Sequence, residues 1–432
     1  MIKPYHTYKK SNIEWIGKIP ENWDTVRLKN IISYQKGKIP SMLYEEKLND
    51  AFIPYLGMDY LRGNKNSIQY VDINANDALI SKEGDVLLLW DGSNAGEFIK
   101  GKDGTVCSTM ALIKTKKNTD NRFFLYLSNI IEHPLRKQTT GMGIPHVNSD
   151  VLNNIICPLP PFSEQRQIAC YLDHKAHQID TLIEKKQKLI ELLKEQRNAI
   201  INQTVTKGLD PEVSMKDSGI EWLGEIPKHW DLRKISRSFN LIGSGTTPKS
   251  DNYDYYENGK IRWVITGDLN DGTLADSSKK ITEKALSDYS ALKVYPKGTL
   301  LIAMYGATIG KISLMNFEGC TNQACCALSN SPYLTNKFTF YWFLSNRQNI
   351  VSMSFGGGQP NISQDVIRGL KISTPPITEQ KQIADYLDHK TCQIDTFIEK
   401  KQKLIDMLKE YRTALISNAV TGKIDVREEA LT

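Results

Sequence analysis

The sequence lacks any long apolar run. No stretch in its 432 residues approaches the roughly 18 apolar residues that a membrane-spanning helix needs. The N-terminal residues 1–15 have no apolar stretch after their lysines, so no secretory signal is expected. The seven cysteines are odd in number and form no C-x-x-C motif, which favours reduced thiols over a disulfide framework. We therefore expect a cytoplasmic protein with no membrane partner.

Catalytic motifs are also missing. No G-x-G-x-x-G opens a helix after a predicted strand, and no Asn/Asp-Pro-Pro-Tyr/Phe tetrapeptide of an amino-methyltransferase occurs. The segment 306–311 resembles a phosphate loop only superficially, because it is one residue too short and lacks Ser or Thr after its lysine. No pair of carboxylates stands out as a general acid and base. The sequence therefore predicts no catalytic residue and no directly bound cofactor.

One pair of histidines has a spacing that could suit a metal. His174 and His177 lie at i and i+3 of a predicted helix, and His389 and Cys392 occupy the same places further along the chain. No third or fourth ligand follows in pattern, so a solvated helix face is favoured over a metal site. We expect no metal site.

Composition sets only broad limits. Hydrophobic residues make up 40% of the chain and charged residues 24%, which is typical of two or three domains with cores of their own. The net charge of +6 is a mild basic bias. Such a bias is compatible with nucleic-acid binding and does not establish it.

Internal repetition is the strongest feature that is present. Residues 160–206 reappear at 375–421, with about 32 of 47 positions identical at a constant offset of 215. Shorter blocks also repeat: 11–24 with 218–231, 83–96 with 297–310, and 141–150 with 356–365. Residues 38–80 and 249–295 share little. Because the period is far too long for a solenoid, the chain is expected to consist of two similar halves with different variable surfaces.

Each copy of the long repeat predicts a helix of about 40 residues. Ser163 and Thr378 are expected to cap these helices, with Glu164 and Glu379 in the first turn, where the helix dipole favours an anion. Apolar residues follow a heptad rhythm, which predicts an antiparallel coiled coil between the two copies; packing of each helix on its own half is the alternative. The expected seam consists of Leu172, Ile179, Leu182, Leu189, Leu193, Ile200, Leu387, Ile394, Phe397, Leu404, Leu408 and Leu415.

The predicted fold class is α+β, because apolar strands ending at glycines alternate irregularly with short helices in each half. We expect two similar globular domains, separated by two long helices and related by a pseudo-two-fold axis. The expected boundaries are 1–162 and 211–377 for the globular domains, 163–210 and 378–421 for the helices, and 422–432 for a C-terminal tail. Two units held apart by a rod could read two DNA half-sites at a fixed spacing.

Several loops are candidates for DNA contact. The loop 243–249 and its counterpart 34–40 combine flexible backbone with hydroxyl or lysine side chains suited to phosphate. The glycine-rich loops 138–146 and 354–361 would let the backbone approach a groove, and the side chains beside them could bind base edges. For each loop a tight structural turn is the alternative. The candidate residues are Lys36, Lys38, Thr139, Thr140, His146, Asn148, Ser244, Thr246, Thr247, Lys249, Gln359 and Asn361.

These motifs together resemble one known family. The Trp-x-Gly-x-Ile-Pro-x-x-Trp opening at 15–23, the Gly-x-x-x-Gly turn at 92–96, a glycine-rich loop before Asp150 and the Pro-Pro-x-x-Glu-Gln-x-x-Ile-Ala-x-x-Leu block at 160–172 recur in the second half. The combination is similar to the specificity subunit of type I restriction–modification systems, over essentially the whole chain. The second half departs slightly at 373–374, where Ser-Thr replaces Pro-Leu.

The resemblance implies a non-catalytic subunit that recognises an asymmetric bipartite sequence in double-stranded DNA. It implies docking of two methyltransferase subunits and of restriction/translocase subunits, which would use S-adenosylmethionine, ATP and Mg. Two other classes of function remain open from the residues alone. One is a self-sufficient DNA methyltransferase or nuclease with divergent motifs, and the other is a structural scaffold that ignores DNA sequence.

Overall fold

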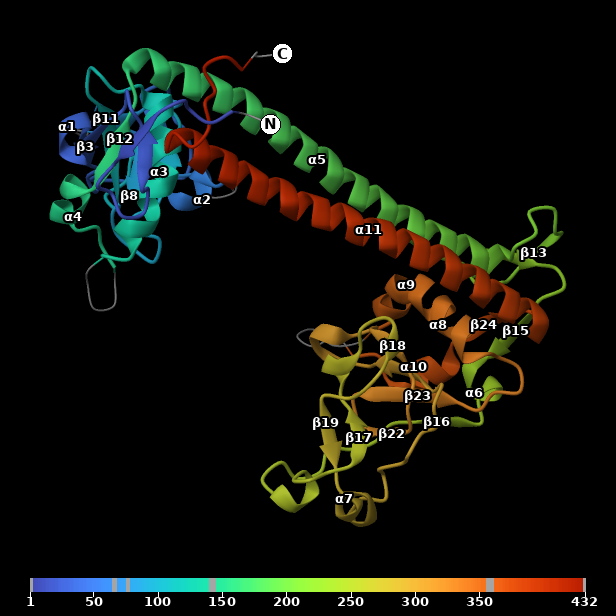
Figure 1. Cartoon of the computed structure of the whole chain (residues 1–432). Coiled ribbons are helices and arrows are strands. Elements are labelled where there is room, and N and C mark those ends of the chain that lie inside the picture. Colours follow the sequence, from blue (N-terminus) through green and yellow to red (C-terminus); the bar gives the residue numbers. More distant parts are fainter. Residues whose placement is uncertain (1–2, 64–67, 75–77, 140–144, 355–360, 430–432) are drawn as a thin grey trace. The chain divides into compact units, whose positions relative to one another are not determined.

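The computed structural model describes residues 3–63, 68–74, 78–139, 145–354 and 361–429 (Figure 1). The chain divides into two compact units, which are described separately. Unit 1 comprises Met1–Lys186 with Lys403–Thr432, and unit 2 comprises Gln187–Gln402. Each unit therefore contains one globular part and a portion of each of the two long helices. The predicted five-part division, in which each long helix is a separate spacer, stays a prediction.

Unit 1 begins with short strands and ends its globular part at the first long helix. Its elements are β1 Tyr8–Lys10, β2 Lys18–Pro20, β3 Asp24–Arg27, α1 Leu28–Ile31, β4 Ile32–Lys36, β5 Phe52–Leu56, α2 Met58–Leu61, β6 Tyr70–Asp72, β7 Ile80–Ser81, β8 Val86–Leu89, β9 Phe98–Lys100, β10 Gly104–Val106, β11 Met110–Thr115, α3 Asn121–Arg136, α4 Ser149–Asn154, β12 Ile156–Leu159 and the start of α5 Phe162–Lys207.

Two four-stranded sheets form the body of unit 1, in the orders β4-β11-β8-β9 and β6-β5-β10-β7. Strand β8 is buried along its whole length. Successive side chains of a strand point to opposite faces, so Val86 and Leu88 pack in the core that includes α3 and α5. Leu87 and Leu89 pack in a second cluster with residues of β5 and β10. A strand covered on both faces explains the unbroken apolar run in the sequence.

Unit 2 repeats this plan with additions. Its elements after α5 are β13 Met215–Asp217, β14 Glu225–Pro227, β15 Asp231–Lys234, α6 Ile235–Ser238, β16 Leu241–Gly243, η2 Tyr253–Tyr255, β17 Ile261–Val264, η3 Thr266–Asp268, β18 Thr273–Leu274, β19 Lys279–Ile281, α7 Glu283–Asp288, β20 Leu300–Ala303, η4 Gly306–Thr308, β21 Ile312–Met315, β22 Gly319–Thr321, β23 Cys325–Ser329, α8 Asn336–Ser345, α9 Arg347–Ser352, α10 Gln364–Gly369, β24 Lys371–Thr374 and α11 Ile377–Val420.

The sheets of unit 2 correspond to those of unit 1. The larger sheet has the order β16-β23-β20-β21-β18, and a three-stranded sheet has the order β19-β17-β22. Strand β20 takes the place of β8, with Leu300 and Ile302 in one core cluster and Leu301 and Ala303 in another. A further small cluster around Trp263 belongs to the region where the two halves of the sequence diverge. The fold class is α+β, as predicted.

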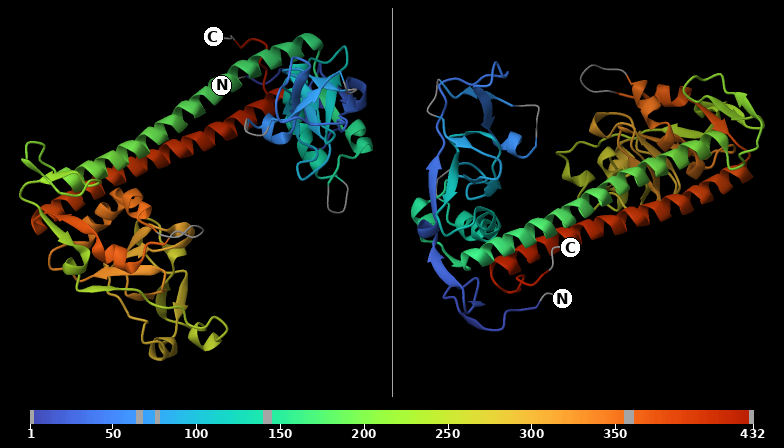
Figure 2. Two further views of the ribbon diagram at one scale, coloured as in Figure 1. Left: turned by 180° about the vertical axis from the view of Figure 1, so that it is seen from behind. Right: turned by 90° about the horizontal axis from the view of Figure 1, so that it is seen from above.

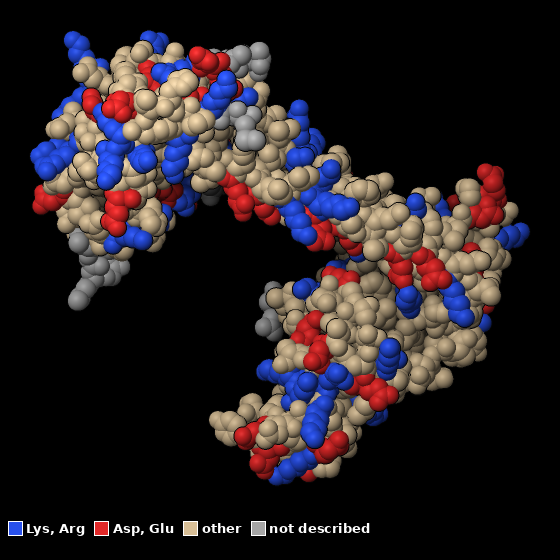
Figure 3. Space-filling model, viewed as in Figure 1, with Lys and Arg blue, Asp and Glu red and all other residues tan. Residues whose placement is uncertain are grey.

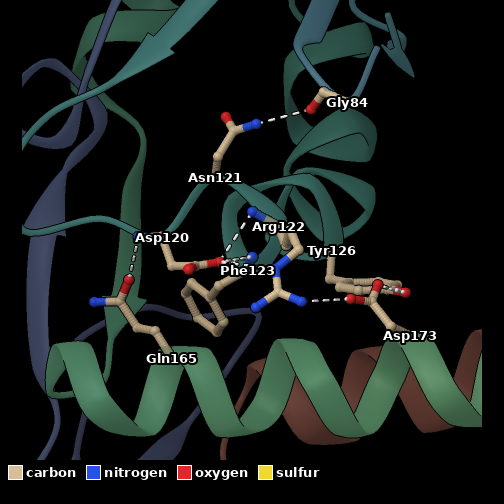
Figure 4. A network of polar contacts seen from close by, with 8 residues as sticks. All are labelled: Gly84, Asp120, Asn121, Arg122, Phe123, Tyr126, Gln165 and Asp173. Atoms are coloured by element: carbon tan, nitrogen blue, oxygen red, sulfur yellow. Dashed lines mark hydrogen bonds and ion pairs between the residues drawn. The ribbon is translucent and has the colours of Figure 1, made fainter.

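The repeated Pro-Pro-x-x-Glu-Gln block joins each long helix to its globular part. In unit 1 the backbone N–H of Asp120 donates to Gln165 Oε1 at 2.8 Å, and Asp120 is the N-cap of α3 (Figure 4). About two turns further along α5, Asp173 accepts hydrogen bonds from Tyr126 and Arg122 of α3, at 2.8 and 3.1 Å (Figure 4). These contacts fix both the position and the direction of α5 against α3.

The same contacts recur in unit 2. The N–H of Thr335, the N-cap of α8, donates to Gln380 Oε1 at 2.8 Å. Asp388 accepts from the Tyr341 hydroxyl at 2.7 Å and forms an ion pair with Lys337. The block is therefore retained in both halves because it holds the same helix–helix junction.

The glutamate of the block has a role that its position in the first turn did not reveal. Glu164 is buried and accepts hydrogen bonds from the Tyr5 hydroxyl at 2.6 Å, the Trp23 indole at 2.9 Å and Asn22 at 2.9 Å. We predicted that Ser163 caps this helix. The helix begins at Phe162, so Ser163 lies inside the first turn and is not the cap. The glutamate thus ties the Trp-containing opening motif to the helix.

Parts of α5 and α11 run side by side within each unit (Figures 1 and 2). In unit 1, Leu172 and Ile179 share one apolar core with Leu415 and Ile416. An ion pair joins Asp180 to Arg412 at 3.1 Å in unit 1, and the equivalent pair joins Arg197 to Asp395 at 3.0 Å in unit 2. The helices are antiparallel at both ion pairs. The two ion pairs are equivalent in the repeat, because Asp395 and Arg412 lie 215 residues after Asp180 and Arg197.

Four of the twelve residues predicted for the coiled-coil seam lie outside it. Leu182, Leu189, Phe397 and Leu404 are exposed. The next residue in the chain takes the inner position in each case, so Ile183, Ile190, Ile398 and Ile405 are the more buried side chains. Alternating spacings of four and three residues lead from Leu172 to Ile183 and Ile190 in α5, and from Leu387 to Ile398 and Ile405 in α11. This is the spacing that a coiled-coil seam requires.

Candidate nucleic-acid interface

In unit 1 three loops meet at one end of the strands in the sheet β4-β11-β8-β9. The ends of β4 and β8 lie on either side of the start of β11, because Lys36 pairs with Ala111 and Leu89 pairs with Met110. The chain before α4 joins them, since the Val147 N–H donates to the Trp90 carbonyl at 2.9 Å. The topology therefore brings segments from three distant parts of the sequence to one place.

Two of the predicted candidates meet in this cluster. Lys36 forms an ion pair with Asp91 at 3.0 Å, with its ammonium 5.5 Å from the centre of the Trp90 ring. Asp91 in turn forms a β-bridge with His146, whose side chain is exposed. Asp91 thus contacts Lys36 through its carboxylate and His146 through its backbone.

Unit 2 builds the same cluster from equivalent segments. The Ile362 N–H donates to the Met304 carbonyl at 2.7 Å, and Tyr305 forms a β-bridge with the exposed Asn361. The loop after β16 is joined through the Gly245 N–H, which donates to Asn322 at 3.3 Å. The loop connections are retained while the side chains at their tips differ.

Two glycines of these loops serve packing within the protein. A Cβ at Gly37 would lie 2.2 Å from the carbonyl oxygen of Cys107, and a Cβ at Gly245 would lie 1.8 Å from that of Thr321. Both distances are far inside van der Waals contact, so only glycine fits. We predicted that these glycines give the loops a flexible backbone for phosphate contact. In the structure, each glycine instead lets two backbone segments of the same domain approach closely.

The remaining candidates differ in how their side chains are used. Asn148 caps α4 by accepting from the N–H groups of Asp150 and Val151, so its oxygen is occupied within the protein. The Thr139 hydroxyl donates to the Arg136 carbonyl at 3.1 Å. Lys38, Thr247 and Lys249 have exposed side chains, and Ser244 and Thr246 are half-buried. Thr140 and Gln359 lie outside the described residues.

Three aromatic residues that the sequence reading overlooked hold the loop after β16. The Trp263 indole donates to the Thr246 carbonyl at 3.2 Å, and the Tyr256 hydroxyl donates to the Pro248 carbonyl at 2.6 Å. The Lys249 N–H donates to the Tyr289 hydroxyl at 3.1 Å. A loop whose backbone is held at three points within four residues is preorganised, so its exposed side chains would lose little entropy on binding. The tyrosine-rich composition of 253–256 was the available signal.

Within the part of the chain that the structure describes, neither charge nor thiol chemistry indicates another kind of site. On the face drawn in Figure 3, Lys and Arg lie among Asp and Glu in both units. Burial raises the pKa of the thiols of Cys157 and Cys326 to about 12, so these cysteines are inert. Across the described residues, no group of three or more His, Cys, Asp or Glu could hold a metal ion.

Comparison with known proteins decides the family. The model described as "Type I restriction modification DNA specificity domain" matches twice, at residues 20–193 and 227–407. The chain belongs to the type I restriction–modification DNA specificity family. Its two matches coincide with the two halves of the internal repeat. As a member of this family it is a DNA specificity subunit of a type I restriction–modification system.

Curated relatives of this specificity subunit cover nearly its whole length. The MjaVIII specificity subunit of Methanocaldococcus jannaschii is 33% identical over 97% of both chains. The MjaIX specificity subunit of the same organism is 25% identical over 96% of both chains. The specificity subunit of EcoDI from Escherichia coli is 21% identical, over 96% of this chain and 91% of its own.

Solved structures share the fold of the specificity subunit. A chain from a study entitled "Structural basis underlying complex assembly and conformational transition of the type I R-M system" matches with a TM-score of 0.68 and 20% identity. It covers 94% of this chain and 99% of its own. The HsdS subunit from Thermoanaerobacter tengcongensis matches with a TM-score of 0.55 and 18% identity, over 94% and 98%. Among the described residues, no helix has the length and apolar character needed to cross a membrane.

Proposed function

We propose that this specificity subunit reads an asymmetric bipartite target in double-stranded DNA, with one half-site bound by each unit. The observation that carries the proposal is the pair of equivalent loop clusters, one around Asp91 and His146 and the other around Tyr305 and Asn361. The same backbone connections hold different side chains in the two units. Since base identity is read through side chains at base edges, unlike clusters would select unlike half-sites.

We further infer that the long helices set the gap between the half-sites. Helices α5 and α11 contain 46 and 44 residues and continue without interruption from one unit into the other. Inserting one heptad into each helix at repeat-equivalent positions preserves the seam and should lengthen the gap in the target. Sequencing the methylated sites of a reconstituted complex measures that gap. An unchanged gap would contradict this role of the helices.

The helices also offer surfaces for the partner subunits. Unit 1 exposes Leu182, Leu404, Met407 and Tyr411, and unit 2 exposes Leu189, Leu192 and Phe397. Large apolar side chains that repeat along a helix outside its seam are typical of an interaction surface. We infer that two methyltransferase subunits dock here, with restriction/translocase subunits completing the complex. S-adenosylmethionine, ATP and Mg would be used by these partners.

A domain exchange tests the bipartite reading. Replacing residues 24–157 with the equivalent segment of a relative of different specificity should change one half of the methylated motif and leave the other unchanged. The reciprocal exchange of residues 231–374 is the matched control and should change the opposite half. If either exchange altered both halves, the two units would not read DNA independently.

A further inference from the structure

The turn between β22 and β23 of unit 2 presents an exposed glutamine at its tip. The Asn322 N–H donates to the Val264 carbonyl at 3.0 Å, and the Asn322 side chain accepts from the Ala324 N–H at 3.1 Å. The Met304 N–H donates to the Ala324 carbonyl at 2.9 Å. These bonds fix the backbone on both sides of Gln323, whose side chain is exposed. Gln323 therefore extends from a rigid support within the loop cluster.

A second hydrogen bond orients the glutamine amide. The Thr247 hydroxyl donates to Gln323 Oε1 at 2.7 Å. Thr247 belongs to the loop that Trp263, Tyr256 and Tyr289 hold in place. Because this bond turns the carbonyl oxygen toward Thr247, the NH₂ group on the other side of the amide faces away from Thr247 and is available to a ligand. Gln323 is thus presented as a hydrogen-bond donor.

Lysine side chains beside this group are also donors. Thr247 lines a pocket of about 360 Å³ together with Ser250, Tyr256, Trp263, Lys279 and Lys280. Lys279 lies opposite Trp263 in the antiparallel pair of β19 and β17, so both side chains are on the same face of that sheet. Lys280 forms an ion pair with Asp276 at 3.7 Å, and the Lys279 side chain is exposed. The pocket therefore offers ammonium groups against aromatic walls, next to the glutamine donor.

We infer that Gln323 and Lys279, oriented by Thr247, are specificity-determining residues of unit 2 and read a guanine in the major groove. Guanine presents two neighbouring acceptors there, O6 and N7, whereas adenine pairs one acceptor with a donor. A glutamine that reads adenine uses its oxygen and its nitrogen together, and here the oxygen is engaged by Thr247. This inference rests on the proposed function and assigns the base class read by one of its two sites.

Unit 1 has different residues at the equivalent positions. The turn between β10 and β11 carries Ser108 where unit 2 has Gln323, because Trp90 bonds to Thr109 as Met304 bonds to Ala324. Ile39 stands where unit 2 has Thr247, two residues beyond the close-packed glycine, and 81% of its surface is exposed. A short hydroxyl and an apolar side chain cannot form the donor pair. The group is therefore specific to the half-site of unit 2.

The test is selection of bound duplexes from random-sequence DNA by the full chain assembled with its methyltransferase subunits. Gln323→Glu replaces the NH₂ donor by an acceptor and should move the preference at one position of the unit 2 half-site from guanine to cytosine, by about tenfold. Lys279→Ala should relax guanine preference in the same half-site. Thr247→Val frees the glutamine oxygen and should admit adenine. Lys371→Ala removes one positive charge from unit 2 outside the pocket and should leave the motif unchanged.

The outcomes separate this inference from the function on which it rests. If the wild type enriches a two-part motif and Gln323→Glu and Lys279→Ala leave it unchanged, the pocket does not read bases and the bipartite function stands. Relaxation at an A·T pair would overturn the assignment to guanine. A wild type that enriches no motif would contradict both the function and the inference. Unchanged thermal unfolding of each variant shows that its fold is intact.

Discussion

At the scale of single residues, the repeated motif is explained by partners that lie far away in sequence. Glu164 accepts from Trp23, which precedes it by 141 residues, and Asp173 accepts from Tyr126. The sequence showed that the block repeats, and it placed Glu164 in the first turn of a helix. It could not show the indole partner, because helix propensity and capping are local and this hydrogen bond is not. The same limit applies to Asn148, which caps α4 although its type suits base contact equally well.

One half-buried carboxylate should make the stability of unit 1 depend on pH. Burial raises the pKa of Glu132 above its ordinary value of 4.5, although its hydrogen bond from the Phe98 N–H at 2.9 Å opposes the shift. The folded state therefore binds the proton more tightly than the unfolded chain does. This contribution is complete below pH 4.5 and is lost as pH rises through the raised pKa, so the charged form costs stability at pH 7.

Replacing that carboxylate by an amide should remove the cost. Glu132→Gln keeps an oxygen for the Phe98 N–H, so the variant should unfold at higher denaturant concentration than the wild type at pH 7. The advantage should shrink as pH falls toward 4.5. Denaturant titrations at a series of pH values measure this difference. Glu184→Gln removes the same charge from an exposed position of α5 in unit 1 and is the control; an equal gain there would show that net charge, and not burial, is the cause.

At the scale of elements, the sequence predicted the two helices and their antiparallel pairing and misplaced one line of contacts. Adjacent apolar residues such as Leu404 and Ile405 made two lines possible, and the rhythm alone did not choose between them. In the structure Ile405 is fully buried and Leu404 is 40% exposed. The choice is made by the partner helix, because a knob at Ile405 continues the spacing set by Leu408 and Arg412.

Truncating each of these two neighbours in turn tests the seam. Ile405→Ala removes a fully buried side chain and should destabilise unit 1 by about 2–4 kcal/mol. Leu404→Ala removes an exposed side chain and should cost less than about 1 kcal/mol. Chemical denaturation followed by circular dichroism measures both variants on the same chain. Equal losses of unfolding free energy in the two variants, or a greater loss at Leu404, would support the seam residues predicted from the sequence.

At the scale of the whole molecule, the C-terminal tail belongs to the unit that contains the N-terminus. Gly422 lies against Pro20 and Trp23 in unit 1, as Gly208 lies against Pro227 and Trp230 in unit 2. Both glycines have positive φ, at +73° and +78°, and each follows the end of a long helix. The repeat predicted equivalent halves, and it did not predict that the end of the second copy would complete the first. That packing depends on α11 bringing the end of the chain back to unit 1, which no local sequence pattern encodes.

The tail should therefore be required for the stability of unit 1 and dispensable for unit 2. Val426 is buried in the core of unit 1, the Asp425 N–H donates to the Lys3 carbonyl at 2.8 Å, and the Arg427 guanidinium lies 4.9 Å from the centre of the Tyr5 ring. A chain ending at residue 421 should lose about 2–3 kcal/mol in unit 1, chiefly through the exposed core around Val426. Hydrogen–deuterium exchange should accelerate across residues 5–24 and stay unchanged across 212–231. Glu428→Ala, an exposed change in the same tail, is the control. Equal acceleration in both segments would mean that the tail stabilises the molecule by some route other than completing unit 1.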